Sequence, residues 1–145
     1  EALGATRQLL EEKKIMLSSE LAQGLPKIEG DRDRLVQVLV NLISNAVKFC
    51  EPEEGKIDIH ARGEGDGLRI DVADNGAGIS SHSMEHLFDP FYSTKESGMG
   101  MGLAISQTII SNHNGKIRAD SWPGKGSNFT IELPPHVEAA VSAAS

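Results

Sequence analysis

The fold of this chain is decided by the stretch Asp71-Val72-Ala73-Asp74-Asn75-Gly76-Ala77-Gly78-Ile79. Apolar residues alternate up to it, at Leu68, Ile70 and Val72, and predict a β-strand that ends there. Asp-Asn-Gly is also a strong signal for a hairpin turn, which would need a second alternating strand directly after it. The residues that follow, Ser-Ser-His-Ser, carry no such alternation. A loop that leads out of the strand is therefore favoured, and a plain hairpin is the alternative.

The size and composition of the chain fit one globular domain. It has 145 residues, of which 39% are hydrophobic and 24% are charged. A net charge of −7 without basic runs argues against nucleic acid as a partner, because binding its backbone depends on clustered lysine and arginine. The single cysteine, Cys50, excludes an internal disulfide and suits a reducing compartment. The sequence has neither a membrane-spanning apolar run nor a charged-then-apolar leader.

Periodicity predicts regular elements along most of the chain. Helices are expected at 2–13, 31–50 and 103–113, and strands at 15–21, 56–62, 68–73, 116–122 and 128–133. Residues 79–102 are expected to form an irregular insert, and residues 136–145 a flexible tail. Helices on one face of a mainly antiparallel sheet make an α+β fold, a two-layer α/β sandwich.

Polar residues share one face of the helix expected at 31–50. Gln37, Asn41, Asn45 and Lys48 follow a helical spacing in an otherwise strongly apolar segment. Burying carboxamides and an ammonium group without partners is costly, so this stripe is expected to line a wet cleft or to meet a ligand. The alternative is an internal hydrogen-bond network between the helix and a strand.

A glycine-rich loop, Gly98-Met99-Gly100-Met101-Gly102, leads directly into the last helix. Its backbone N–H groups and the positive end of the helix dipole could receive an anion. The loop lacks the Gly-x-x-x-x-Gly-Lys-Ser/Thr pattern of a P-loop, and it does not follow a strand as a Rossmann Gly-x-Gly-x-x-Gly loop does. Both of those folds are disfavoured.

Four segments together resemble the N, G1, F and G2 boxes of sensor histidine kinases. They lie in order at Asn41–Phe49, Asp74–Gly78, Leu87–Phe91 and Gly98–Leu103. The superfamily, which has the Bergerat fold, also holds type II topoisomerases, mismatch-repair ATPases and ninety-kilodalton heat-shock chaperones. The resemblance implies a catalytic domain over residues 14–135 that binds ATP and Mg²⁺ under a mobile lid. Residues 1–13 would be a linker, or the stub of an upstream helical hairpin domain.

The resemblance assigns the base of the nucleotide to the stretch quoted first. Asp74 would accept a hydrogen bond from the adenine amino group, and Gly76 and Gly78 would let the backbone curl under the base. Phe49 would pack near the sugar or the base, and Ile79 is counted with these cofactor-binding residues.

The phosphates and the metal are assigned to the polar stripe and the lid. Asn45 would offer its amide oxygen to Mg²⁺, Asn41 would contact the phosphate or metal region, and Lys48 would pair with phosphate oxygens. The lid would add Phe91, Lys95, Gly98, Gly100, Met101, Gly102 and Leu103. Lys95 is equally well explained as a solvated loop lysine.

Asn41, a catalytic candidate with Lys48, favours phosphoryl transfer over hydrolysis. Hydrolytic members of the superfamily carry a glutamate here, and asparagine cannot act as a general base. The resemblance thus implies transfer of the γ-phosphoryl group to a histidine on an upstream dimerisation and phosphotransfer domain, and then to a response regulator. The histidines of this chain lack the acceptor setting and are expected to be exposed or in the lid: His60, His82, His86, His113 and His136.

We therefore expect the catalytic domain of a protein histidine kinase that lacks its own acceptor. By itself it is expected to be a monomer and its parent a homodimer, cytoplasmic with or without a membrane anchor. The alternatives are a non-transferring nucleotide-binding regulatory module, a topoisomerase-type or chaperone-type ATPase, and a serine kinase of the anti-sigma kind.

Overall fold

The computed structural model describes residues 2–24, 30–65, 67–89 and 102–135. The helices in this part are α1 (Ala2–Lys13), α2 (Arg32–Phe49), α3 (Ser81–Glu85) and α4 (Gly102–Asn112), and the strands are β1 (Met16–Leu21), β2 (Lys56–Glu64), β3 (Gly67–Asp74), β4 (Lys116–Trp122) and β5 (Gly126–Leu133). All the predicted helices and strands are present. The expectation of an irregular insert is wrong in one respect, because α3 lies within it. This helix is too short for a periodic signal, and it is started by Ser80, whose side chain accepts the N–H of Ser83.

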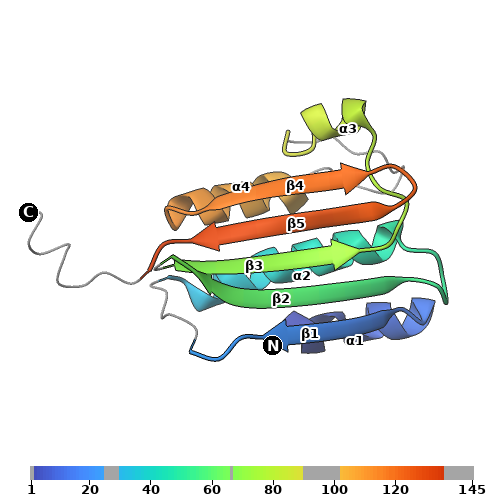
Figure 1. Ribbon diagram of the computed structural model, residues 1–145, viewed down its shortest axis with the longest axis horizontal. Coiled ribbons are helices and arrows are strands. Elements are labelled where there is room, and N and C mark those ends of the chain that lie inside the picture. The colour runs from blue at the N-terminus through green and yellow to red at the C-terminus, as the bar shows by residue number, and fades with distance from the viewer. Residues whose placement is uncertain (1, 25–29, 66, 90–101, 136–145) are drawn as a thin grey trace, which may run out of the picture.

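The strands form one mixed sheet in the order β1-β2-β3-β5-β4 (Figure 1). β2 pairs with β3, β3 with β5 and β4 with β5 in antiparallel fashion, whereas β1 runs parallel to β2. The parallel pair follows from the connection, since α2 crosses over between β1 and β2 and parallel neighbours need such a crossover. The predicted α+β sandwich with a mainly antiparallel sheet is confirmed. The loop after β3 enters α3 rather than a second strand, so the plain hairpin is excluded.

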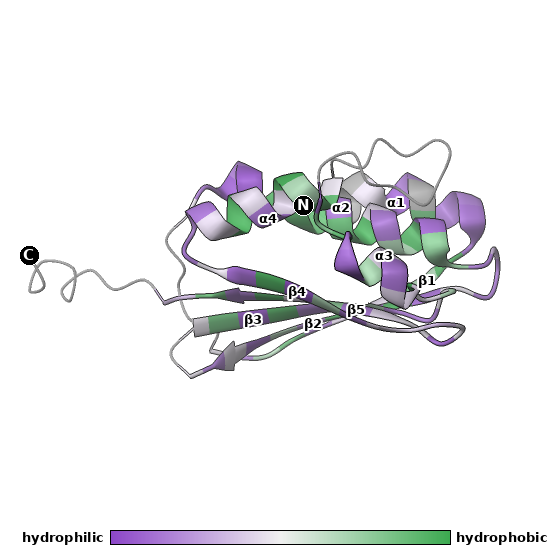
Figure 2. Ribbon diagram, turned by 90° about the horizontal axis from the view of Figure 1, so that it is seen from above, coloured by the Kyte–Doolittle hydropathy of each residue, from purple (hydrophilic) through white to green (hydrophobic). Residues whose placement is uncertain are grey.

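The helices α1, α2 and α4 form a layer on one face of the sheet (Figure 2). Strand β2 shows why the helices cover only one face of the sheet. Its apolar side chains at 57, 59 and 61 are buried, while its polar ones at 58, 60 and 62 are exposed. Alternate side chains of a strand point to opposite faces, so one face of the sheet meets the helices and the other meets solvent.

The central helix of this layer is α2, which packs against both α1 and α4. Its buried side chains are Val38, Leu42, Ile43, Ala46 and Val47. Asp31 caps its start, where the side chain accepts the N–H of Arg34 at 3.2 Å. Cys50 ends the helix and is buried, and this burial raises the pKa of its thiol.

Helix α1 is packed into the same layer. Thr6 and Leu10 are buried, and the Lys13 Nζ donates to the carbonyl oxygens of Val47 at 2.9 Å and Cys50 at 3.1 Å. An ammonium group there satisfies carbonyls at the end of α2 and interacts favourably with its dipole. The assignment of residues 1–13 to a linker or stub stays a prediction. None of the described helices has the length and apolar character to cross a membrane.

A polar network surrounds Asp71 on the outer face of the sheet. Its carboxylate accepts hydrogen bonds from Arg69 Nε at 3.0 Å, Thr130 Oγ1 at 2.7 Å and Asn128 Nδ2 at 3.2 Å. Burial alone raises the pKa of Asp71, but these three hydrogen bonds and the charge of Arg69 outweigh it and hold the pKa below 3.8. The ionised form is therefore favoured in the folded protein.

One histidine expectation is wrong. His113, which follows α4, is half-buried, and its Nε2 accepts the N–H of Asp31 at 2.9 Å while its Nδ1 lies 2.8 Å from the carbonyl oxygen of Ile109. It joins the end of α4 to the start of α2. A local pattern cannot reveal this contact, because its partners are 82 residues apart. His60 and His82 are exposed as expected, His86 is half-buried, and His136 lies outside the described residues.

Candidate functional site

Asp74, the last residue of β3, is a buried carboxylate with an unused oxygen. The residue is 8% exposed, and Oδ1 accepts the backbone N–H of Gly76 at 2.9 Å. Oδ2 is buried and has no hydrogen-bond partner among the described residues. Burial raises the pKa of Asp74, and the N–H groups of Gly76 and Ser127 partly offset that effect. An acceptor of this kind is suited to a donor supplied by a ligand.

Asn75 holds the loop rather than facing a ligand. Its Oδ1 accepts the N–H of Lys56 at 2.7 Å, and its Nδ2 donates to the carbonyl oxygen of Glu54 at 3.1 Å. Lys56 is the first residue of β2 and Glu54 lies in the turn before it, so this side chain fixes the end of β3 to the start of its neighbour. Asparagine suits the position because it offers a donor and an acceptor on one short side chain.

The glycines of the loop are required by close packing. A Cβ on Gly76 would overlap the carbonyl group of Phe49, whose carbon would lie 2.7 Å away. A Cβ on Gly78, which has φ +78°, would overlap the carbonyl group of Trp122, with the carbon at 2.8 Å. The N–H of Ala77 also donates to the carbonyl oxygen of Phe49 at 3.1 Å. The loop therefore lies directly against the C-terminal end of α2.

Within the polar stripe on α2, Asn41 faces the N-terminal half of α4. Asn41 Nδ2 donates to the carbonyl oxygen of Gly102 at 3.3 Å and to the hydroxyl of Ser106 at 3.2 Å. The internal network considered as an alternative is thus present at Asn41, although its partner is a helix and not a strand. Asn45, one turn along, has a buried Nδ2 without a partner among the described residues. One carboxamide is satisfied within the fold, and the other is left with an unused donor.

The end of α2 carries the remaining candidates of this helix. Lys48 is exposed, so its ammonium group can reach a ligand in solvent, and Phe49 is half-buried, with its backbone carbonyl against the loop after β3. The site is therefore the region where three elements meet: the C-terminal ends of β3 and α2, and the N-terminus of α4. At that N-terminus, backbone N–H groups lack helical acceptors and can receive an anion.

The lid candidates are only partly described. Gly102 begins α4 and is exposed, and Leu103 is half-buried against the core. Phe88, which belongs to the F box at Leu87–Phe91, also packs against the core. The other lid candidates lie outside the described residues: Phe91, Lys95, Gly98, Gly100 and Met101.

Serines that support the site were missed from the sequence. Ser106, fully buried, is a partner of Asn41, and its place on the inner face of a predicted helix was the available signal. Ser121 accepts the N–H of the buried Ile79 at 2.6 Å and lies 3.0 Å from the hydroxyl of Ser127. These hydroxyls fix the backbone that follows the two glycines of the loop.

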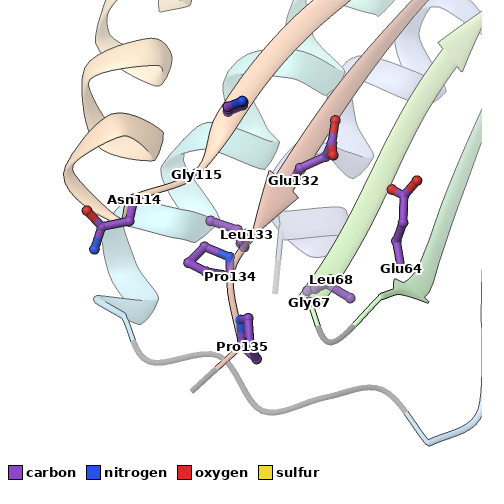
Figure 3. A pocket seen from close by; sticks show the side chains of 10 residues that line it. Glu64, Gly67, Leu68, Asn114, Gly115, Glu132, Leu133, Pro134 and Pro135 are labelled. Atoms are coloured by element: carbon purple, nitrogen blue, oxygen red, sulfur yellow. The ribbon is translucent and has the colours of Figure 1, made fainter. Parts of the chain in front are cut away.

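A shallow hollow lies at the other end of the sheet (Figure 3). It has a volume of about 270 Å³, and its lining includes Glu64, Leu68, Glu132 and Leu133. Leu68 pairs with Leu133 at one end of the β3–β5 ladder, whereas Asp74 pairs with Ser127 at the opposite end. The hollow is therefore separate from the candidate site, and its charged lining consists of the carboxylates of Glu64 and Glu132 and the ammonium group of Lys116.

Comparison with known proteins agrees with this geometry. Residues 30–137 match the model of a family described as histidine kinase-, DNA gyrase B-, and HSP90-like ATPase. Sensor histidine kinase ZraS of Escherichia coli O157:H7 is 39% identical over 125 residues, which make up 86% of this chain and 27% of that protein. The chain thus spans about a quarter of the length of this curated relative.

Solved structures show the same fold. The nucleotide-free catalytic domain of histidine kinase ThkA superposes with a TM-score of 0.82 at 31% identity, over 92% of this chain and 88% of that one. ThkA in complex with response regulator protein TrrA superposes with a TM-score of 0.78 at 29% identity, over 93% of this chain and 38% of that one. The likeness therefore covers the catalytic domain nearly in full.

Proposed function

Since this chain belongs to the family of histidine kinase-, DNA gyrase B-, and HSP90-like ATPases and is a catalytic domain of the histidine kinase type, we propose that it binds ATP with Mg²⁺. It donates the γ-phosphoryl group to a histidine on a separate dimerisation domain, from which a response regulator receives it. The partners of the parent protein and its homodimeric state are part of this proposal. The function needs cytoplasmic ATP, so we place the domain in the cytoplasm, whether or not the parent is anchored in a membrane.

The observation that carries the proposal is a pair of buried polar atoms without partners at one end of the fold. They are Oδ2 of Asp74 and Nδ2 of Asn45, two of three such atoms among the described residues. Each unsatisfied group costs about 1–3 kcal/mol, and a ligand that bonds to both would remove that cost. An acceptor at one position and a donor at the other suit the amino group of adenine and an oxygen of a phosphate.

On the base side, Asp74 accepts the adenine amino hydrogen through Oδ2. Gly76 lets the loop lie close to the end of α2 and Gly78 lets it lie close to the end of β4, because a Cβ at either position would overlap a backbone carbonyl group. Phe49 and Ile79 supply apolar surface for the base or the sugar. Selection of adenine rests on Asp74, because a base with a carbonyl at that position would set an acceptor against an acceptor.

On the phosphate side, Asn45 is the candidate ligand of Mg²⁺, and its chemistry fits the ion. Magnesium prefers oxygen ligands and keeps several waters, so one amide oxygen together with phosphate oxygens suffices. When bound, the ion neutralises charge that develops on the phosphates. The unused Nδ2 of Asn45 then donates to a phosphate oxygen.

Asn41 and Lys48 position the phosphates for transfer. Lys48 is exposed at the end of α2 and pairs with phosphate oxygens as a point charge. Asn41 cannot remove a proton from water, so hydrolysis stays slow and the phosphoryl group is kept for the histidine. Gly102 and Leu103, with the lid residues Phe91, Lys95, Gly98, Gly100 and Met101, complete the enclosure.

The decisive experiment mixes this chain with an isolated helical hairpin domain that carries an acceptor histidine, in the presence of γ-labelled ATP and Mg²⁺. We expect label on the hairpin in an acid-labile, alkali-stable form, as phosphohistidine behaves, and little free phosphate. Nucleotide binding by calorimetry without transfer would instead indicate a regulatory module. Rapid release of phosphate would indicate an ATPase, and label on serine a serine kinase.

A further inference from the structure

Three potential metal ligands gather on α3 and the turn that follows it. His82, Glu85 and His86 each offer one ligand atom, and these atoms all lie within 4.8 Å of one another. The two imidazole rings have centroids 5.2 Å apart and meet edge to face at 63°. His82 and Glu85 are exposed, and His86 is half-buried.

The spacing of these residues explains why they meet. Positions i and i+4 lie on the same side of a helix, so two histidines at that spacing can hold one ion, and Glu85 comes from the same turn. A tetrahedral Zn²⁺ with bonds of about 2.0–2.1 Å needs ligand atoms about 3.3 Å apart. Rotation of the exposed His82 and Glu85 side chains can bring the ligand atoms from within 4.8 Å of one another to this distance.

A second contact prepares His86 as a ligand. Its Nδ1 lies 2.9 Å from Oδ2 of Asp89, which is exposed. When Nδ1 donates to this carboxylate, the lone pair of the neutral ring lies on Nε2, which would then be the ligand atom. Histidine ligands of metals commonly have such a carboxylate partner, which orients the ring and raises its basicity.

The backbone that carries the cluster is well anchored. Ser80 caps α3 by accepting the N–H of Ser83, and its carbonyl oxygen accepts the N–H of Met84 at 2.9 Å. Met84, with Leu87 and Phe88, packs against the hydrophobic core. The three ligands are therefore carried by a segment whose backbone is hydrogen-bonded and whose apolar side chains pack against the core.

We propose that His82, Glu85 and His86 form a binding site for a divalent transition metal of the zinc class, with Asp89 as the group that orients His86. Two imidazoles and one carboxylate are a ligand set that Zn²⁺ accepts in proteins, with water in the fourth position. The site is distinct from the Mg²⁺ position at Asn45, and it does not depend on ATP.

The test is calorimetric titration of the whole 145-residue chain with ZnCl₂, without nucleotide and in a buffer that does not bind metals. We expect one ion per chain. Asp89→Asn removes only the group that orients His86 and should weaken binding by about 10- to 100-fold. His82→Ala and His86→Ala each remove a ligand and should weaken binding by more than about 100-fold, beyond that range. His60→Ala removes an exposed histidine elsewhere and should leave the affinity unchanged.

Co²⁺ provides an independent readout, because a tetrahedral nitrogen and oxygen site gives a strong visible absorption that an octahedral surface complex lacks. Circular dichroism confirms that each variant is folded, and Glu85→Gln tests the third ligand without changing its shape. No 1:1 binding up to 1 mM Zn²⁺, or full binding by the His82→Ala/His86→Ala double variant, would overturn the proposal. An equal loss in His60→Ala would also overturn it, since it would reveal general surface binding.

Discussion

Replacing Asp74 by asparagine tests the nucleotide site at the point where the structure is most specific. The change keeps the shape of the side chain and removes its charge. Oδ1 can still accept the N–H of Gly76, which lies 2.9 Å away, so the loop keeps its internal hydrogen bond. At Oδ2, however, an NH₂ group replaces the acceptor, and it would face the amino group of adenine donor against donor.

The size of the effect follows from this geometry. One hydrogen bond to a charged acceptor is worth about 1.5–3 kcal/mol, and each 1.4 kcal/mol is a factor of ten, so ATP affinity should fall about 10- to 150-fold. The free energy of unfolding, by contrast, should stay the same or rise. Burial raises the pKa of Asp74 above 3.8, so its ionisation destabilises the folded state as pH rises through that range. Asparagine removes this cost, and the variant without nucleotide should be as stable as the original or more so at pH 7.

The assay is a calorimetric titration with ATP and Mg²⁺ at pH 7, beside urea unfolding of the same samples at pH 7 and near pH 3. Asp120→Asn is the matched control, because this carboxylate is exposed on β4 and should change neither quantity. Unchanged ATP affinity in Asp74→Asn would show that the adenine assignment is wrong. A large loss of stability would show instead that the buried charge is needed for folding.

Three further predictions, which use four substitutions, test the fold and the proposed metal position. Asp71→Asn should lower the free energy of unfolding by about 1.5–3 kcal/mol at pH 7, and because the pKa of Asp71 is held below 3.8, the difference from the original should shrink as pH falls through that value in urea titrations. Gly78 and Gly124 both have a φ of +78°, so replacing either by alanine should lower the free energy of unfolding by about 1–2 kcal/mol through backbone strain. Only Gly78→Ala should lower it by about 1–3 kcal/mol more, since a Cβ at Gly124 has nothing within 4 Å. Equal losses in urea unfolding would contradict the packing argument. Asn45→Ala removes a buried donor that has no partner among the described residues, so the free energy of unfolding should change by about 1 kcal/mol or less. The ATP affinities measured with and without Mg²⁺ should become alike in this variant.

Much of the fold could be predicted because its signals are local. The alternation in β2 and the apolar spacing in α2 each place side chains on one face of one element, and the sheet and helix layer follow from burying those faces together. Asp31 could be recognised as a cap for the same reason, since its partner is three residues away. The short helix α3 was missed because five residues are too few to show a period.

The candidate site divides in the same way. The sequence predicted Asn41 and Asn45 as site residues because polar residues in apolar settings are costly to bury without a purpose, and it predicted Asp74 through the resemblance of its loop to the family. It could not distinguish the two asparagines. Asn41 is satisfied by α4, whereas Asn45 has an unused donor, and only the position of α4 against α2 makes that difference.

By itself, the sequence determined the elements of this protein and the order of its boxes, and it predicted which residues would meet a nucleotide. These predictions depend on the period of the apolar residues along each element and on glycines at positions where the backbone turns tightly. Only the tertiary structure decided that β1 runs parallel at the edge, that His113 joins α4 to α2, and which polar atoms are left without partners. The reason is that a local pattern states which side of an element a residue occupies, while packing between distant segments determines what lies opposite.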